Sequence, residues 1–306
     1  MVVRVGVIGL SEGNGHPFSL SAIINGYSDA GFTDSGWPVI HDYLKRRHPS
    51  EFGVGELRVT HAWTQDPGLT QRLCKASLIE TAVAAPEELI GSVDAVILAR
   101  DDHENHRAMA APFLEAGIPL FVDKPLTLSL PDLDYFRPYL ERGQLMSGSA
   151  MRYATELDVV RSTIQSYGRI KLIRGAVLND WARYGVHMLE AIQPLLRGRP
   201  VEVTSHAALH ESVFVTMDDG MVVLIDALGD VPKTFRVDVF GTERASSHEI
   251  SDNFSMFRRM LWQFAEMVRT GRPTIPAAHT LDVLRMLIAG REAMNTRGTV
   301  QLDPSE

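Results

Sequence analysis

Short apolar runs alternate with amphipathic segments along the first 150 residues. Each run is rich in valine, isoleucine or leucine, and the segments between the runs have the 3.6-residue spacing of helices. Strands that alternate with helices in this way form a parallel sheet, so the pattern predicts a doubly wound α/β domain. The expected strands are residues 2–8, 57–63, 81–84, 93–99, 119–122 and 144–149.

The second half of the chain has a different pattern. An Asp-Asp-Gly turn at residues 218–220 separates two apolar runs, and Asp-Gly supplies the positive φ that a hairpin needs. Strands between residues 170 and 250 would form an open, mainly antiparallel sheet with helices on one face, an α+β domain. We therefore expect two domains, at residues 1–126 and 127–306. The helices expected in the second are residues 155–167, 184–196, 257–269 and 280–295.

The composition is that of an ordinary globular protein, with 45% hydrophobic and 22% charged residues in a chain of 306. No apolar run approaches the roughly 18 residues of a membrane-spanning helix, and the first residues do not resemble a signal peptide. The net charge of −8 disfavours nucleic acid and anionic membranes as partners. Cys74 is the only cysteine, which excludes an internal disulfide and leads us to expect a cytoplasmic location.

A glycine-rich stretch joins the first expected strand to a helix. Gly9 begins it, Ser11 and Asn14 occupy the second and third positions of the usual three-glycine fingerprint, and Gly13 and Gly15 lie close to them. Backbone N–H groups at a helix N-terminus can hold a pyrophosphate, and three glycines in seven residues permit its close approach. The stretch indicates a nucleotide-binding loop in which the first four of these residues contact the cofactor. The alternative is an ordinary tight turn.

The end of the second strand distinguishes NAD from NADP in such folds, because a carboxylate there binds the ribose 2′-hydroxyl of NAD. Thr64 and Gln65, which occupy this place, are neutral. A 2′-phosphate would be tolerated, with Arg72 or Lys75 as its counter-charge. The sequence therefore predicts an NAD(P) site with Thr64 as a contact and a weak preference for NADP, and NAD remains the alternative.

Acidic and imidazole side chains follow the fourth strand, at residues 100–106. Such side chains are metal ligands, but acidic residues also complement the dipole at the start of a helix, and Asp102 is placed to act as an N-cap. We favour the second interpretation and expect no metal site.

The fifth expected strand, residues 119–122, is a continuous apolar run that leads directly into Asp123, Lys124 and Pro125. The carboxyl end of a strand in an open α/β sheet is the edge where ligands bind. A lysine on this rigid element is suited to hold a substrate or cofactor hydroxyl. The alternative is a surface lysine in a strand-to-helix turn.

Asp123-Lys124-Pro125 resembles the Glu-Lys-Pro signature of the Gfo/Idh/MocA family of nicotinamide-dependent oxidoreductases. The stretch from Arg183 to Glu190, with His187 inside it, resembles the Asp-x-Gly-x-His-x-x-Asp motif of that family. The resemblance extends over nearly the whole chain and implies an N-terminal Rossmann domain followed by an α+β domain. Further matches are Asp94-Ala95-Val96, His106, Arg152, Gly241-Thr242-Glu243, Phe264, Gly271 and Pro273.

The resemblance also implies roles for individual residues. Lys124 would bind the cofactor ribose and the reacting oxygen, His187 would be the general acid/base, and His106 would belong to the cofactor site. Imidazole suits proton transfer because it titrates near neutral pH. The carboxylate that the family places four residues before the histidine is replaced by Arg183. We expect either Asp180 to compensate for it or Arg183 to bind an anionic part of the substrate.

Two other departures indicate an altered pocket. Asp101 and Asp102 replace a common Thr-Pro pair of the family, so we include Asp101 among the cofactor contacts. Asn14 and His16, on the variant glycine-rich loop, are either functional or a turn-capping asparagine and a surface histidine.

The function expected from these residues is an NAD(P)-dependent dehydrogenase or reductase. Its substrate would be a secondary alcohol or ketone of a sugar, aminosugar or cyclitol. One alternative is an enzyme that keeps its cofactor bound and uses transient oxidation for elimination or epimerisation. Another is an NAD(P)-binding sensor without catalysis. An open sheet in the second domain leads us to expect a homo-oligomer that assembles through it.

Overall fold

The computed structural model describes residues 2–302, and the chain divides into two compact units. The first unit contains residues up to 127 together with 134–147 and 257–277. The second contains residues 128–133, 148–256 and the chain from 278 onward. The functional division expected at residue 126 stays a prediction.

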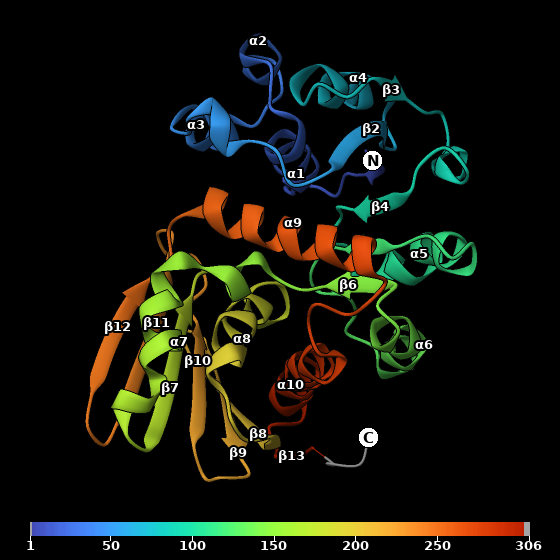
Figure 1. The fold of residues 1–306 in the computed structure, drawn as a ribbon. Helices are drawn as coiled ribbons and strands as arrows, with labels where there is room; N and C mark the ends of the chain where they lie inside the picture. Colours follow the sequence, from blue (N-terminus) through green and yellow to red (C-terminus); the bar gives the residue numbers. More distant parts are fainter. Residues whose placement is uncertain (1, 303–306) are drawn as a thin grey trace. The chain divides into compact units, whose positions relative to one another are not determined.

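The first unit contains a six-stranded sheet in which every pair of neighbouring strands is parallel (Figure 1). Its strand order, β3-β2-β1-β4-β5-β6, reverses direction at β1, as in a doubly wound sheet. This confirms the predicted fold class. The strands are β1 (Val3–Ile8), β2 (Leu57–Trp63), β3 (Thr81–Ala82), β4 (Ala95–Leu98), β5 (Leu120–Val122) and β6 (Leu145–Ser147).

Helices connect these strands and cover the sheet. α1 and α4 pack against β2, and α5 packs against β4 and β5 (Figure 1). The start of α4 follows from its sequence, because the Asp66 carboxylate accepts a hydrogen bond from the Leu69 N–H and Pro67 begins the helix. The helices are α1 (His16–Asn25), α2 (Asp29–Thr33), α3 (Pro38–Lys45), α4 (Pro67–Ala76), α5 (His106–Glu115) and α6 (Leu130–Glu141).

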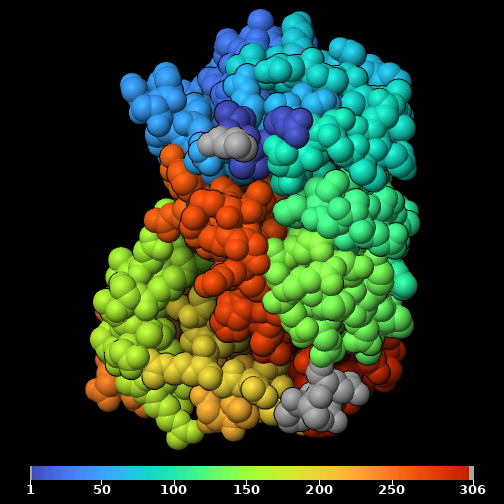
Figure 2. All heavy atoms as spheres, turned by 45° about the vertical axis from the view of Figure 1, so that its right-hand side comes forward, coloured from blue at the N-terminus to red at the C-terminus, as the bar shows by residue number. Residues whose placement is uncertain are grey.

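A late segment of the chain completes the first unit. Residues 257–277 contain most of α9 (Asn253–Thr270), and the Phe264 ring lies edge-on to Phe121 of β5 at 6.1 Å. Figure 2 shows the orange atoms of this segment beside the green atoms of residues 134–147. The core at the carboxyl end of β5 is therefore built partly from residues about 140 positions later.

The second unit contains a seven-stranded sheet of order β12-β11-β7-β10-β9-β8-β13. Its neighbours are antiparallel except β7 and β10, which are parallel. The predicted hairpin joins β9 to β10, with Gly220 at φ +82°. The strands are β7 (Ile170–Val177), β8 (Pro200–Ala207), β9 (Glu211–Met217), β10 (Val222–Ala227), β11 (Phe235–Gly241), β12 (Ala245–Glu249) and β13 (Val300–Gln301).

Two predicted helices of the second unit are broken into shorter pieces. The helix expected at 155–167 consists of α7 (Asp158–Thr163) between two 3-10 turns. The helix expected at 184–196 starts earlier, with a π-helical turn (Trp181–Gly185) that leads into α8 (Val186–Ile192). α8 packs against β7 and β11. The last helix, α10, spans Ala277–Thr296.

Trp181 is the largest fully buried side chain of the second unit. Its Nε1 donates a hydrogen bond to the Leu287 carbonyl at 2.8 Å. A Cβ atom at Gly185 or at Gly290 would lie 2.6 Å from atoms of the indole ring. Glycine at both positions therefore allows α10 and the π-helical turn to pack against opposite parts of one aromatic ring.

We expect Gly290→Ala to lower the free energy of unfolding by about 1–3 kcal/mol, because the added methyl group would overpack the indole ring. Alanine favours a helix by about 1 kcal/mol over glycine, so the clash must exceed this gain. Gly298→Ala is the matched control, since its Cβ would be 3.3 Å from the rotatable Thr296 hydroxyl. Urea denaturation followed by tryptophan fluorescence measures both. Equal stability of the two variants would contradict the packing argument.

Candidate functional site

The glycine-rich loop begins where β1 ends, at the carboxyl edge of the parallel sheet. A Cβ atom at Gly9 would lie 2.5 Å from Pro17 Cγ, so the chain needs glycine to turn into α1. Gly13 has φ +77° and nothing within 4 Å of its would-be Cβ. Gly15 lies against Trp37 and Ile40, where a Cβ would come within 2.6 Å and 2.5 Å of their side chains. The loop is therefore packed at both ends and open at its middle.

Backbone donors of this loop are available to a ligand. The N–H of Asn14 donates to the Ser11 carbonyl at 3.1 Å. The N–H groups of Ser11, Glu12, Gly13 and Gly15 donate to no other residue between positions 2 and 302. Donors of this kind, beside an open glycine at the start of a helix, fit the pyrophosphate of a dinucleotide.

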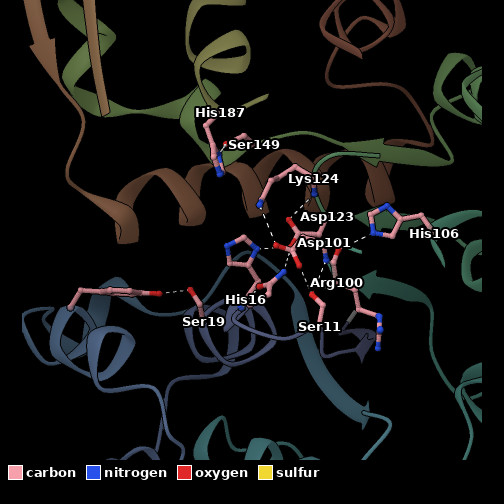
Figure 3. A network of polar contacts seen from close by, with 12 residues as sticks. Ser11, His16, Ser19, Arg100, Asp101, His106, Asp123, Lys124, Ser149 and His187 are labelled. Atoms are coloured by element: carbon pink, nitrogen blue, oxygen red, sulfur yellow. Dashed lines mark hydrogen bonds and ion pairs between the residues drawn. The ribbon is translucent and has the colours of Figure 1, made fainter. Parts of the chain in front are cut away.

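Ser11 connects the loop to the end of β4. Its hydroxyl forms a short hydrogen bond with the Asp101 carboxylate and accepts the Asp101 N–H at 3.0 Å. The other carboxylate oxygen of Asp101 lies 3.5 Å from the Lys124 Nζ. The structure thus brings together three of the predicted site residues at the carboxyl ends of β1, β4 and β5 (Figure 3).

Asp123 is buried beside Lys124 and accepts three hydrogen bonds. The donors are Asn14 Nδ2 at 2.9 Å, His16 Nδ1 at 2.5 Å and the Lys124 N–H at 2.8 Å. Asn14 also accepts the His16 N–H through Oδ1 at 2.8 Å. Asn14 therefore both caps its turn and contacts the site, and His16 is not a free surface histidine (Figure 3).

The charge of Asp123 is maintained by these partners. Burial opposes its ionisation, but the positive charge and hydrogen bond of His16, with Lys124 and Asn14, outweigh burial and hold the pKa of the carboxyl well below its usual range. These contacts form an ion network in the first unit, in which the Asp123 carboxylate pairs with the His16 imidazole and the Asp101 carboxylate with the Lys124 ammonium.

The end of β2 is occupied by internal contacts. The Thr64 hydroxyl donates to the Asp66 carbonyl at 2.8 Å, so it faces its own turn. The Gln65 side chain binds both backbone groups of Leu10, at 3.0 Å and 2.6 Å. Arg100 Nη1 lies 3.1 Å from the Gln65 Oε1 and is the cation nearest to this place in the contacts described. Of the counter-charges expected from the sequence, Lys75 pairs instead with Asp34 at 3.1 Å.

Asp102 lies at the expected N-cap position, before the 3-10 turn His103–Asn105, but its side chain does not cap the turn. Its side chain makes no capping hydrogen bond, because its carboxylate is taken up by the Arg100 guanidinium at 2.8 Å and 2.6 Å. His106 is fully buried, and its two ring nitrogens lie 2.9 Å from the carbonyls of Arg100 and Leu126. It therefore joins the segments that carry Asp101 and Lys124 and has no nitrogen left for a cofactor.

His187 lies on α8 in the second unit, where its Nδ1 is 2.6 Å from the Ser149 Oγ. Tyr184 and Phe235 place their rings 5.1 Å and 5.9 Å from the imidazole. Ser149 Oγ also accepts the Met151 N–H at 3.2 Å, which fixes the hydroxyl at the start of a 3-10 turn. A hydroxyl thus orients the His187 imidazole.

Asp180 and Arg183 have simpler surroundings. The Asp180 carboxylate accepts the Arg183 N–H at 2.9 Å and so caps the π-helical turn. The Arg183 side chain is exposed, and its guanidinium has no hydrogen-bond or ion-pair partner in the part of the chain that the structure describes. The structure shows neither of them in contact with His187, and their catalytic roles stay predictions.

A buried ion pair lies behind His187. Arg152 Nε contacts the Glu190 carboxylate at 2.5 Å, and Arg152 Nη1 donates to Gln193 at 2.8 Å. Burial raises the pKa of Glu190 although Arg152 opposes this. The Ser149 N–H also stabilises the Glu190 carboxylate, so the pair helps to fix the residue that holds the His187 imidazole.

Two residues of these networks could not be identified as partners from the sequence. Ser149 lies 38 positions from His187, and no local pattern connects them. His16 lies 107 positions from Asp123, although an acid next to the candidate lysine at a strand end was a usable signal. No cluster of potential metal ligands occurs among residues 2–302, and no helix in that range is long and apolar enough to cross a membrane.

Comparisons with known proteins agree with the geometry of the first unit. Residues 3–143 match a family model described as an oxidoreductase family with an NAD-binding Rossmann fold, GFO_IDH_MocA. A protein of Amycolatopsis mediterranei (strain S699) assigned as a UDP-kanosamine synthase oxidoreductase subunit is 30% identical over 118 residues. That match covers 38% of this chain and 32% of the relative, so it spans about a third of the relative's length.

Solved structures resemble the whole chain. The myo-inositol 2-dehydrogenase of Lactobacillus plantarum has a TM-score of 0.78 at 14% identity, over 99% of this chain and 100% of that one. The scyllo-inositol dehydrogenase of Lactobacillus casei, solved with NAD(H) and scyllo-inositol, has a TM-score of 0.77 at 12% identity, over 98% and 99%. At these identities the likeness establishes the fold.

The depressed pKa of Asp123 makes a prediction for stability. The folded pKa lies below the value of about 3.9 in an unfolded chain, so the carboxylate stabilises the fold at neutral pH and this contribution is lost as the pH falls below the unfolded value. From pH 6 to pH 3, wild type should lose about 1 kcal/mol more than Asp123→Asn, which has no carboxyl to titrate. Urea denaturation at each pH measures the loss, and the exposed Asp42→Asn should follow wild type. A parallel decline of the two Asp→Asn variants would refute the argument.

Proposed function

Because residues 3–143 belong to the Gfo/Idh/MocA oxidoreductase family with its NAD-binding Rossmann fold, we propose that this protein is an NAD(P)-dependent dehydrogenase or reductase. It transfers hydride between the nicotinamide and a secondary alcohol or ketone. The observation that carries this proposal is the presence of Lys124 at the same sheet edge as the open loop that begins at Gly9. One edge of the sheet would then hold both the dinucleotide and the lysine that binds the substrate oxygen.

Each chemical role can be given to a residue with suitable surroundings. The nicotinamide supplies or accepts the hydride when the cofactor is bound. The ammonium of Lys124 holds the reacting oxygen and stabilises its negative charge as the carbinol carbon loses hydride. The imidazole of His187, oriented by Ser149, exchanges the hydroxyl proton. The N–H groups of residues 11–15 and the side chains of Ser11 and Asp101 form the cofactor cradle.

The substrate class follows from the relatives and from the charges. Inositol dehydrogenases share the fold, and a relative that matches 118 residues of this chain is assigned as a UDP-kanosamine synthase oxidoreductase subunit. A polyol suits such a site because its hydroxyl oxygens can accept hydrogen bonds from the Lys124 ammonium. We therefore place the substrate among sugars, aminosugars and cyclitols.

We extend the proposal to a preference for NADP. The end of β2 offers no carboxylate to the ribose 2′-hydroxyl, because Gln65 occupies that place and Asp66 caps α4. Arg100, next to Gln65, is a cation within reach of the same place, although Asp102 shares its charge. We also propose a cytoplasmic location, because a chain with a single cysteine needs no oxidising compartment.

We expect Lys124→Ala and His187→Ala to fold like wild type and to lose turnover by about 10²- to 10⁴-fold, because each removes a group that stabilises charge or moves a proton in the transition state. NADH and NADPH formation with a panel of inositols, hexoses and aminosugars measures turnover, and fluorescence titration gives the affinity for each cofactor. Tighter binding of NADPH is the expected result.

The outcomes of this experiment separate the alternatives. Wild-type rates in both alanine variants would refute the assigned roles. Product formation without a change in cofactor absorbance would indicate transient oxidation, and cofactor binding without turnover of any substrate would indicate a sensor. Arg183 is exposed, and the variant Arg183→Ala tests whether this side chain binds an anionic group of the substrate. If it does, KM should rise while kcat stays constant.

We also propose that the protein is a homo-oligomer that assembles through the sheet of the second unit. Neighbouring strands present Leu172 opposite Phe240 and Leu224 opposite Phe214, and the two phenylalanines are 41% and 37% exposed. The two pairs lie in neighbouring cross-strand rows, since Leu172 also pairs with Val222 and Leu224 with Arg174. Exposed apolar side chains on a sheet face are typical of an interface between subunits.

Phe214→Glu combined with Phe240→Glu should therefore convert the assembly to monomers, since charges would be buried without partners in the interface. Light scattering after gel filtration measures the mass. Leu209→Glu, a change at a fully exposed position between β8 and β9, is the matched control and should leave the mass unchanged. A monomeric wild type, or an oligomer that survives the double change, would refute this interface.

A further inference from the structure

The pair formed by His16 and Asp123 has the geometry of a catalytic dyad. The carboxylate can only accept hydrogen bonds, so at 2.5 Å it holds the proton on His16 Nδ1. Nε2 of the same ring has no partner among the residues that the structure describes, and the side chain is 22% exposed. A neutral ring in this state carries an available lone pair on Nε2, and the carboxylate stabilises the imidazolium that forms when Nε2 takes a proton.

The surroundings of the dyad keep its carboxylate fixed. Asn14 and the Lys124 N–H hold Asp123 from two other directions, and its side chain is only 4% exposed. The edge of the Phe257 ring lies against the imidazole at 5.1 Å and adds no charge. The charged groups that influence His16 are therefore Asp123, Lys124 and, beyond Lys124, Asp101.

His106 and His41, two other histidines of the first unit, lack this combination. His106 has both nitrogens on backbone carbonyls. His41 also pairs with a carboxylate, Asp29, at 2.8 Å, but that carboxylate is 70% exposed on the surface and the imidazole is buried. The His41–Asp29 pair is thus chemically similar, but its imidazole is not accessible to a substrate, so it serves as an internal comparison.

The proposed hydride transfer uses one acid/base, which His187 supplies. A ketone that results from such a transfer acidifies the hydrogen on the adjacent carbon, and its removal requires a second base. An ammonium near the ketone oxygen lowers the barrier by stabilising the enolate, and Lys124 provides it. His16 and Lys124 flank the two carboxylates of the same network (Figure 3).

We propose that the His16–Asp123 dyad is this second base and that the protein exchanges a carbon-bound proton next to the substrate carbonyl. The inference rests on the proposed function. His16 Nε2 takes the proton, the electrons of the C–H bond form the C=C bond of the enolate, and the carbonyl oxygen gains the negative charge beside Lys124. Return of a proton from Nε2 to the same face of that carbon regenerates the ketone, and exchange of the Nε2 proton with solvent in between replaces the hydrogen on that carbon.

Deuterium incorporation tests this step. The 2-keto derivative of myo-inositol and a 3-keto hexose are incubated in D₂O with the protein and NADPH or NADH. Reduction traps any deuterium next to the former carbonyl, because the alcohol product no longer exchanges it. Wild type should yield product with one deuterium at that carbon, detected by mass spectrometry and NMR.

His16→Asn is the informative variant, since the asparagine amide can replace the Nδ1–H donor to Asp123 while Nε2 is lost. It should incorporate at least tenfold less deuterium per product molecule than wild type, in line with the usual contribution of a general base. His41→Gln, which retains an amide donor to Asp29, should match wild type. Unlabelled product from wild type, or equal label from His16→Asn, would overturn the inference.

Carbethoxylation gives a readout that needs no turnover. Diethyl pyrocarbonate should modify His16 at Nε2 much faster than the buried His106, and peptide mass mapping reports both sites. Resistance of His16 would overturn the dyad. Absence of NAD(P)H oxidation with every ketone refutes the proposed function, and this inference with it, whereas NAD(P)H oxidation that leaves the product unlabelled refutes the inference alone.

Discussion

The buried carboxylate of Asp123 is the constraint on which the organisation of the first unit depends. A charge with so little exposure is stable only with several donors, and these come from the loop after β1, from α1 and from the next residue of its own segment. Meeting that requirement fixes the position of Asn14 and His16 relative to Lys124. The positions of Asn14 and His16 at the glycine-rich loop therefore follow from one desolvated charge.

Much of the fold follows from local patterns in the sequence. The apolar runs located all six parallel strands within a few residues, and the Asp-Gly turn correctly located a hairpin. Longer-range features were not predictable in this way. The segment 257–277 looks like part of the second half of the chain, but Phe264 packs on Phe121 because its apolar face fills a core that begins 143 positions earlier. Helix periodicity does not reveal which sheet a helix covers.

The candidate site shows the same limit. The glycine-rich loop and the Lys124-Pro125 pair could be located from the sequence, because backbone conformation and strand ends are local properties. The partners of charged side chains are not determined by local sequence. Asp102 resembled a capping residue in the sequence, but its carboxylate accepts hydrogen bonds from the Arg100 guanidinium instead. Thr64 was expected to face a cofactor, yet its hydroxyl satisfies its own turn. Competition among acceptors decides such contacts, and the competitors are known only from the folded chain.

The hydroxyl of Ser149 next to His187 has a consequence for the proposed chemistry. A carboxylate on Nδ1 would stabilise the imidazolium by charge, whereas a serine hydroxyl orients the ring and adds little charge stabilisation. In this chain the carboxylate-paired, accessible imidazole is His16, in the first unit, and its carboxylate is the one that burial and three donors hold ionised. The two histidines therefore differ in the group that orients the ring, which is a hydroxyl for His187 and a buried carboxylate for His16.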